Sequence, residues 1–128
     1  MSSSSADELA ELAFEGLPDY LFEWLIENVH TIRMKNYTGF AYKTRKPYLI
    51  VMTSLDLYDD NQITFLHEFS HCWLGHTQKR SPNVEEEAGT QVYDWLYEAG
   101  RHELAEKAWR DVDFGRCRDQ PPVGYVVF

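Results

Sequence analysis

The sequence lacks the cysteine pattern of a disulfide-rich protein or of a zinc site built on thiolates. Its 128 residues contain two cysteines, Cys72 and Cys117, which are far apart and show no metal-ligand spacing. In a reducing compartment both are expected to be thiols rather than a disulfide. The fold must therefore depend on a hydrophobic core, and this length suffices for one such core but not for two.

Long apolar runs and clusters of basic residues are missing as well. No segment approaches the roughly 20 apolar residues of a membrane-spanning helix, and the first residues lack the basic and apolar regions of a signal peptide. We therefore expect a cytoplasmic protein with no membrane partner. Lys and Arg number 12 against 21 Asp and Glu, a net charge of −9. Because phosphate neutralisation needs clustered Lys and Arg, direct nucleic-acid binding is not expected.

What the sequence does contain is typical of a folded globular domain. Hydrophobic residues make up 44% of the chain and aromatic residues 15%. The only low-complexity stretch is the serine run Ser2–Ser5. We therefore expect residues 1–5 to be a disordered tail and residues 6–128 to form a single domain.

The spacing of apolar residues predicts more helix than strand. Helices are expected over 6–14, 19–30, 61–74, 84–99 and 101–110. Segments rich in aromatic and β-branched residues predict two strands that form a hairpin, 38–42 and 48–53, and a short last strand, 125–128. The expected fold class is α+β, a helical domain with a small β-sheet or hairpin packed on the helix over 61–74.

The most specific pattern is the HExxH motif His67-Glu68-Phe69-Ser70-His71. Histidines at i and i+4 lie on the same side of a helix, so both imidazoles can bind one tetrahedral Zn²⁺ at roughly 2.0–2.1 Å. Glu68 lies about 100° round the helix, where it flanks the metal and can act as a base on a metal-bound water. A chance occurrence in a chain of this length is on the order of one per cent.

The neighbouring residues favour a metal over two ordinary helix histidines. Phe65, Phe69 and Trp73 cover much of the side opposite His67. A helix that is apolar on both sides is buried. Buried imidazole nitrogens need partners, and a metal ion supplies one for each histidine.

A third ligand is expected from the run Glu85-Glu86-Glu87 at the start of the next helix. The apolar stripe of that helix is centred near Ala88. Glu85 falls inside it, about 60° from Ala88, whereas Glu86 points the other way and Glu87 lies about 100° off. A carboxylate aimed at the core is costly without a partner, so Glu85 is the predicted ligand, with Glu87 next. The alternative is that all three are first-turn acids favoured by the helix dipole.

The remaining histidines do not complete the motif. His76 stands nine positions after His67, whereas the extended metzincin pattern requires its third His at ten, and no Met follows to form a Met-turn. His30, His76, His102 and Tyr93 are candidates for a side chain that polarises the substrate. Spacing does not choose among them.

The stretch 39–96 resembles the ImmA/IrrE family of small metallopeptidases, which are gluzincin-like HExxH proteins. A strand such as Tyr48-Leu-Ile-Val-Met precedes the motif. The segment 62–76 is similar to the family's Phe-Thr-x-x-His-Glu-x-x-His-x-x-Leu-x-His. Glu85-Glu-Glu-Ala88 followed by Trp95-Leu96 is similar to its Glu-x-x-Ala…Leu-Leu helix.

The resemblance implies His67, His71 and Glu85 as metal ligands and Glu68 as catalytic base. It also implies a protein substrate, typically a transcriptional repressor of the helix-turn-helix type. Three departures stand against it. Gly89 replaces the usual Asn or Asp, Gln91-Val92 replaces Phe-Ala, and the 13 residues between His71 and Glu85 are few for the family.

The expected function is that of a zinc-dependent endopeptidase acting on a protein or peptide substrate, with Zn²⁺ as its cofactor. The alternative is a non-catalytic zinc-binding interaction module on the same fold. Glu68 beside the ligand pair favours the enzyme, because a structural zinc site more often has four protein ligands, commonly including Cys.

Overall fold

The computed structural model of the protein describes residues 2–33, 40–42, 48–75 and 82–111. The helices are α1 (Ser2–Ala13), α2 (Asp19–Asn28), α3 (Asp59–Trp73), α4 (Pro82–Glu98) and α5 (His102–Asp111), and the strands are β1 (Val29–Arg33), β2 (Phe40–Tyr42) and β3 (Tyr48–Met52). This helix-dominated arrangement agrees with the predicted α+β class. The predicted strand 125–128 lies outside the described residues.

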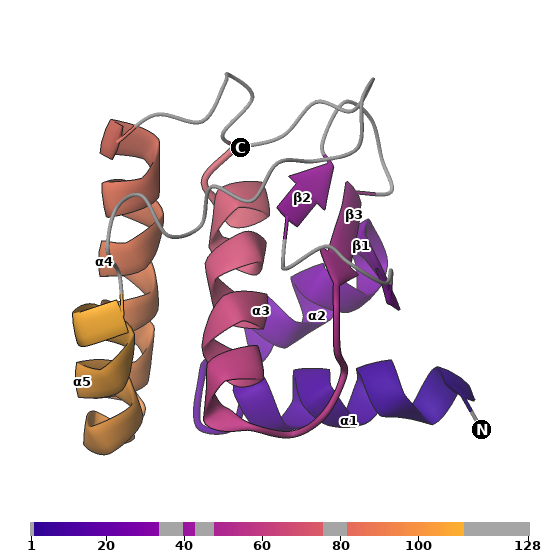
Figure 1. Ribbon diagram of the computed structural model, residues 1–128, viewed down its shortest axis with the longest axis horizontal. Helices are drawn as coiled ribbons and strands as arrows, with labels where there is room; N and C mark the ends of the chain where they lie inside the picture. The colour runs from indigo at the N-terminus through magenta and orange to yellow at the C-terminus, as the bar shows by residue number, and fades with distance from the viewer. Residues whose placement is uncertain (1, 34–39, 43–47, 76–81, 112–128) are drawn as a thin grey trace.

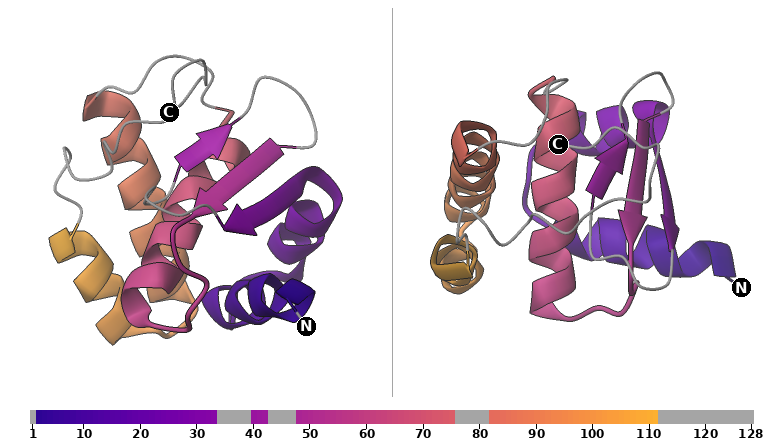
Figure 2. Two further views of the ribbon diagram at one scale, coloured as in Figure 1. Left: turned by 45° about the vertical axis from the view of Figure 1, so that its right-hand side comes forward. Right: turned by 45° about the horizontal axis from the view of Figure 1, so that its top comes forward.

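Helix α3 occupies the middle of the molecule. In Figure 1, α4 and α5 lie on one side of α3 and the sheet lies on the other, while α1 and α2 run below and behind. The right-hand view of Figure 2 shows the same order of layers. Residues on α3 can therefore contact both the helical pair and the sheet.

The core around α3 is rich in aromatic rings. Phe69 packs edge-on against Phe14 of the α1–α2 turn, with ring centroids 4.8 Å apart, and against Trp24 of α2 at 5.8 Å. On its other side it contacts Trp95 of α4 at 5.6 Å. Such ring pairs add to the gain from burial. They hold the side of α3 that carries Phe69, and so fix the direction in which its histidines point.

The sheet has the strand order β1-β3-β2. β2 pairs with β3 in antiparallel orientation, with Phe40 opposite Val51, so the predicted hairpin is confirmed. β1 pairs with β3 in parallel orientation, with Val29 opposite Tyr48. A parallel neighbour for the hairpin was not predicted, because nothing local to either segment indicates it.

The prediction that the second helix continues to His30 is wrong. α2 ends at Asn28, and Val29 has extended backbone angles (φ −128°, ψ 139°). The Asn28 amide donates a hydrogen bond to the Trp24 carbonyl at 3.0 Å, which satisfies one of the orphan groups at the helix end. Val29 and the two β-branched residues that follow favour a strand, and pairing with β3 decides the outcome.

At the N-terminus, α1 begins at Ser2 and so includes Ser2–Ser5, the run assigned above to a disordered tail. The C-terminal ends of α3 and α4 lie within one residue of the prediction, whereas both helices begin two residues earlier than predicted, at Asp59 and Pro82. Gly75 after α3 and Gly100 after α4 have φ values of 73° and 80°, the left-handed conformation that ends a helix. These two stops set the lengths of the helices that carry the HExxH motif and the glutamate run.

Arg101, in the turn between α4 and α5, connects three parts of the fold. Its Nη1 donates to the carbonyl oxygens of Ala13 and Glu15, at 2.8 and 3.1 Å, just at the end of α1. Its Nη2 donates to Oε1 of the buried Gln62 on α3 at 2.7 Å. A cation at a helix C-terminus also interacts favourably with the helix dipole.

We therefore expect Arg101→Ala to destabilise the fold by about 2 kcal/mol, because it removes hydrogen bonds from a charged donor and leaves Gln62 without this partner. Urea unfolding followed by fluorescence measures the change. Arg110→Ala, an exposed Arg on α5, is the matched control and should change stability by less than about 0.5 kcal/mol. Equal losses in the two variants would show that Arg101 does not tie these segments together.

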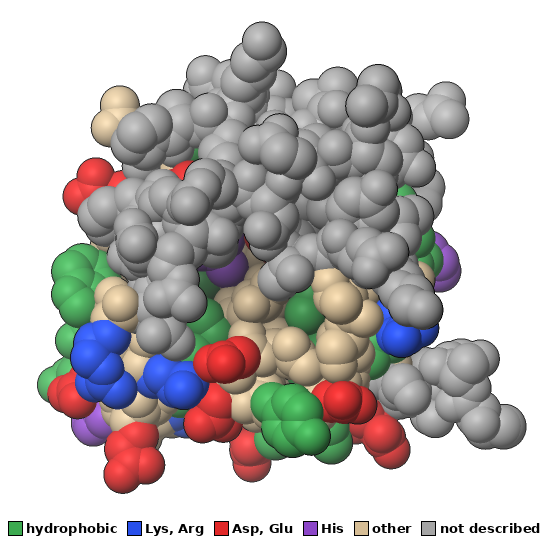
Figure 3. All heavy atoms as spheres, in the orientation of Figure 1, with side chains coloured by type: hydrophobic (Ala, Val, Ile, Leu, Met, Phe, Trp, Pro, Cys, Tyr) green, Lys and Arg blue, Asp and Glu red, His purple; other side chains and the backbone are tan. Residues whose placement is uncertain are grey.

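Acidic side chains are prominent on the surface. In Figure 3, Asp and Glu side chains follow the lower edge of the visible face, and Lys and Arg side chains lie at its two sides. This distribution agrees with the net charge of −9. Within the described ranges, no helix combines the length and the apolar character needed to cross a membrane.

Candidate metal centre

Two helices bring the predicted ligands together. His67 and His71 are one turn apart on α3, with ring centroids 4.9 Å apart. Glu85 reaches them from the first turn of α4. Its Oε1 lies 2.8 Å from Nε2 of His67 and 3.5 Å from Nε2 of His71. One ligand atom from each of the three side chains lies within 4.8 Å of the other two.

The burial of the three side chains agrees with the predicted helix phase. His67 is 3% exposed, His71 0% and Glu85 2%. Glu86 and Glu87 are exposed. Helix-dipole preference alone would let all three acids face the solvent, so it does not explain why one of them is directed into the core.

The distances fit a tetrahedral ion after a small adjustment. Ligand atoms 2.0–2.1 Å from a tetrahedral Zn²⁺ are about 3.3 Å apart. The 3.5 Å between His71 and Glu85 is close to that value. The 2.8 Å between His67 and Glu85 is a direct hydrogen bond, so a metal ion would replace the shared proton and move these atoms apart by roughly half an ångström. The donor set of two imidazoles and one carboxylate suits zinc.

Glu85 carries the charge that such a site needs. Burial by itself would raise the pKa of Glu85, but hydrogen bonds from His67 and His71 and their charge lower it to about 2. The carboxylate is therefore ionised at neutral pH. A ligand that is already deprotonated does not have to lose a proton when a metal binds.

Ser70 is a positioning residue that the sequence did not reveal. Its buried hydroxyl lies 2.6 Å from the carbonyl oxygen of His67 and 3.3 Å from that of Ala88 on α4. A hydroxyl has one proton, so it donates to one of these carbonyls at a time. Ala88 is one turn beyond Glu85, and the contact therefore holds the ligand-bearing turns of α3 and α4 beside each other. In the sequence, the one indication of this role is that Ser70 falls on the same side of its helix as His67.

Glu68 follows His67 on α3 and is fully buried. A carboxylate inside a protein requires compensation by charge or hydrogen bonds. Glu68 projects about 100° round the helix from its neighbour His67, and it is not one of the three groups that share ligand distance.

The other candidates named from the sequence lie elsewhere. Tyr93 of α4 packs against Tyr97 and Trp109, with ring centroids 5.7 and 5.3 Å away. His102 stacks on Tyr97 at 4.3 Å, and His30 lines a separate pocket next to α1. The structure thus adds none of these three to the cluster. His76 and Cys117 are outside the described residues, and Cys72 packs in the apolar core.

Comparison with models of protein families, with curated proteins and with solved structures gives no match to this chain. The resemblance to ImmA/IrrE peptidases therefore rests on the sequence motif, and the candidate metal site rests on the geometry of His67, His71 and Glu85.

Proposed function

We propose that the protein is a zinc-dependent endopeptidase of the ImmA/IrrE type. The observation that carries this proposal is the buried cluster of His67, His71 and Glu85, formed by two helices, with Glu68 directly beside it on α3. Two His and one carboxylate are the protein ligands of many catalytic zinc sites, which keep a further position for water or substrate.

Each residue has a distinct part in the reaction. His67, His71 and Glu85 hold the metal, which when bound supplies Lewis-acid chemistry by lowering the pKa of a water and polarising the substrate carbonyl. Glu68 accepts a proton from the attacking water and returns it to the leaving amine. Ser70 keeps α3 and α4 aligned through the carbonyls of His67 and Ala88.

Hydrolysis of a mixed peptide library, followed by mass spectrometry, tests the proposal. Protein loaded with one equivalent of Zn²⁺ should cleave internal bonds in a subset of peptides, because endopeptidases select by sequence around the bond. A chelator should stop cleavage, and added Zn²⁺ should restore it. Cleavage that persists in the chelator, or no cleavage by fully loaded protein of unchanged fold, would reject the peptidase assignment.

The near-complete burial of all three ligands favours one second candidate, a zinc site that only stabilises a binding module. If the site only stabilises the fold, removal of zinc should lower the melting temperature strongly, and the zinc-loaded protein should show no hydrolysis. The melting temperature of the metal-free protein, read beside the peptide assay, separates the two candidates.

A further inference from the structure

Four ring-bearing side chains form a continuous row across the contact between α4 and α5. Tyr93 and Tyr97, one turn apart on α4, have ring centroids 5.7 Å apart. Trp109 of α5 lies 5.3 Å from Tyr93, and His102 of α5 stacks on Tyr97 at 4.3 Å. Each α4 ring therefore contacts a ring of α5, in the order that antiparallel packing of the two helices gives. We call these four residues the ring surface.

The ring surface is partly open to solvent. Tyr97 is 48% exposed and Trp109 is 49% exposed, whereas Tyr93 packs partly against the core. In Figure 3, hydrophobic side chains reach the surface at the left margin, where α4 and α5 lie in Figure 1. Exposed Trp and Tyr side chains are typical of sites that bind a protein partner, because their burial supplies a large share of the binding energy at interfaces.

Acidic residues accompany the rings on both helices. On α5, positions 102, 106 and 109 are spaced i, i+4 and i+7, so Glu106 lies on the same side as His102 and Trp109. On α4, the exposed Glu86 is two turns before Tyr93 on the same side. Residues 82–111 contain eight Asp and Glu against three Lys and Arg. The ring surface is therefore apolar and lies in an acidic region.

The basic residues of this region leave most of that charge uncompensated. Arg101 donates to carbonyl oxygens at the end of α1, and Lys107 lies 3.4 Å from Asp60 of α3. The third cation is Arg110, next to Trp109. A second copy of the chain, which has a net charge of −9, a nucleic acid or an anionic membrane would each bring like charges together. A basic partner is the one that charge complementarity favours.

Arginine and lysine side chains match both parts of this surface. Their methylene stems can cover apolar rings while their charged ends reach carboxylates, and Arg also packs its planar group on aromatic rings. We propose that the ring surface binds a basic segment of a protein partner, with Arg or Lys stems on Tyr97 and Trp109 and their charged ends near Glu106. The ring surface shares no residue with the candidate metal centre, so the proposal goes beyond the peptidase function and does not depend on it.

Selection from a displayed library of random peptides, about twelve residues long, tests the proposal. Peptides that bind the Tyr97→Ala/Trp109→Ala double variant are removed first, so the peptides then kept by the unaltered chain depend on these rings. We expect the kept peptides to contain on average at least about two more Arg and Lys residues than the library before selection. An absence of enrichment, or enriched peptides that are neutral or acidic, would overturn the proposal.

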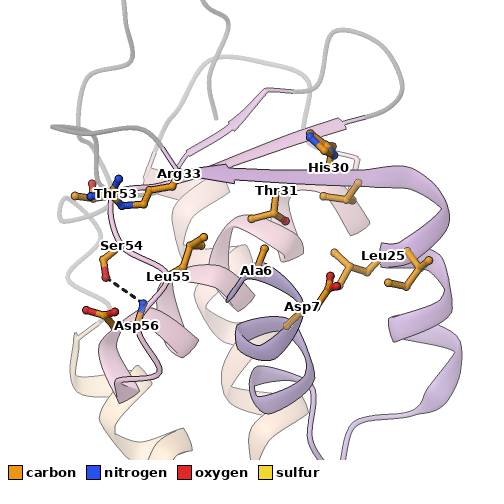
Figure 4. A pocket seen from close by; sticks show the side chains of 13 residues that line it. Ala6, Asp7, Leu25, His30, Thr31, Arg33, Thr53, Ser54, Leu55 and Asp56 are labelled. Atoms are coloured by element: carbon orange, nitrogen blue, oxygen red, sulfur yellow. Dashed lines mark hydrogen bonds between the residues drawn. The ribbon is translucent and has the colours of Figure 1, made fainter. Parts of the chain in front are cut away.

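Single variants, measured with one selected peptide, locate the contact. Trp109→Ala and Glu106→Lys should each weaken binding at least about fivefold, the first by removing a half-exposed ring and the second by reversing a charge. Tyr58→Ala removes a ring that is 69% exposed outside the ring surface. Asp7→Lys reverses a charge in the pocket between α1 and β1 (Figure 4). Both controls should bind like the unaltered chain.

Melting curves confirm that each variant, including the double variant, is folded. Equal losses in the controls and in the ring-surface variants, or no loss in either Trp109→Ala or Glu106→Lys, would show that the peptide binds elsewhere and would overturn the proposal.

Discussion

Glu68→Gln is expected to reduce peptide hydrolysis by at least about a hundredfold, the lower end of what a positioned general base contributes. Gln has nearly the same shape as Glu but cannot accept the proton from water. Because Glu68 is outside the three groups at ligand distance, zinc affinity should change by less than about threefold, well under the tenfold that corresponds to 1.4 kcal/mol.

The matched comparison is His71→Ala, which removes a fully buried ligand. This variant should lose both zinc binding and hydrolysis. Its metal-free form shows whether the protein still folds without zinc. Zinc competition with a chromophoric chelator and the peptide assay are run on both variants. If Glu68→Gln loses zinc as completely as His71→Ala, Glu68 is a ligand and the separation of roles is wrong.

Substitution of the three adjacent glutamates should have effects that follow their burial. Glu85→Ala removes the carboxylate 2.8 Å from His67 and should weaken zinc binding by at least tenfold, a cost above about 1.4 kcal/mol. Glu86→Ala, at an exposed position of the same helix turn, should be nearly silent and serves as the control. Glu87→Ala, also exposed, should have a small effect through the helix dipole.

The same chelator competition measures all three, and Glu85→Gln adds a distinction. Gln keeps the size of the side chain but lacks the charge, so a large loss of affinity in Glu85→Gln identifies the ionised carboxylate as the ligand. A series in which Glu86→Ala is the most damaging variant would mean that α4 presents a different side to α3.

Helix periodicity accounts for what the sequence revealed of the site. The 3.6-residue repeat is a local property, so it places His67 and His71 together and separates Glu85 from Glu86 without knowledge of the fold. The structure confirms this phase, since Glu85 is buried and Glu86 is exposed. The roles of these residues in metal binding and catalysis stay predictions until zinc is measured.

Features that depend on distant segments were missed. β1 forms because residues 29–33 pair with 48–52, and α2 alone gives no sign of that partner. The apolar residues of α2 keep helical spacing through Val29, so the sequence pattern favoured a helix that continues to His30, which is wrong. The contact of Ser70 with Ala88 and the pocket between β1 and α1 likewise require the packing of elements that are far apart in sequence. Local patterns predict the elements and their phases, whereas tertiary packing determines their neighbours.

The most direct test of the metal centre is a crystal structure of the zinc-loaded protein with diffraction data collected at the zinc absorption edge. We predict one anomalous peak about 2.0–2.1 Å from Nε2 of His67, Nε2 of His71 and a carboxylate oxygen of Glu85. The 2.8 Å contact between His67 and Glu85 should lengthen to about 3.3 Å as the ion replaces the proton. A zinc-loaded crystal that keeps the 2.8 Å contact and has no peak among these three side chains would contradict the account.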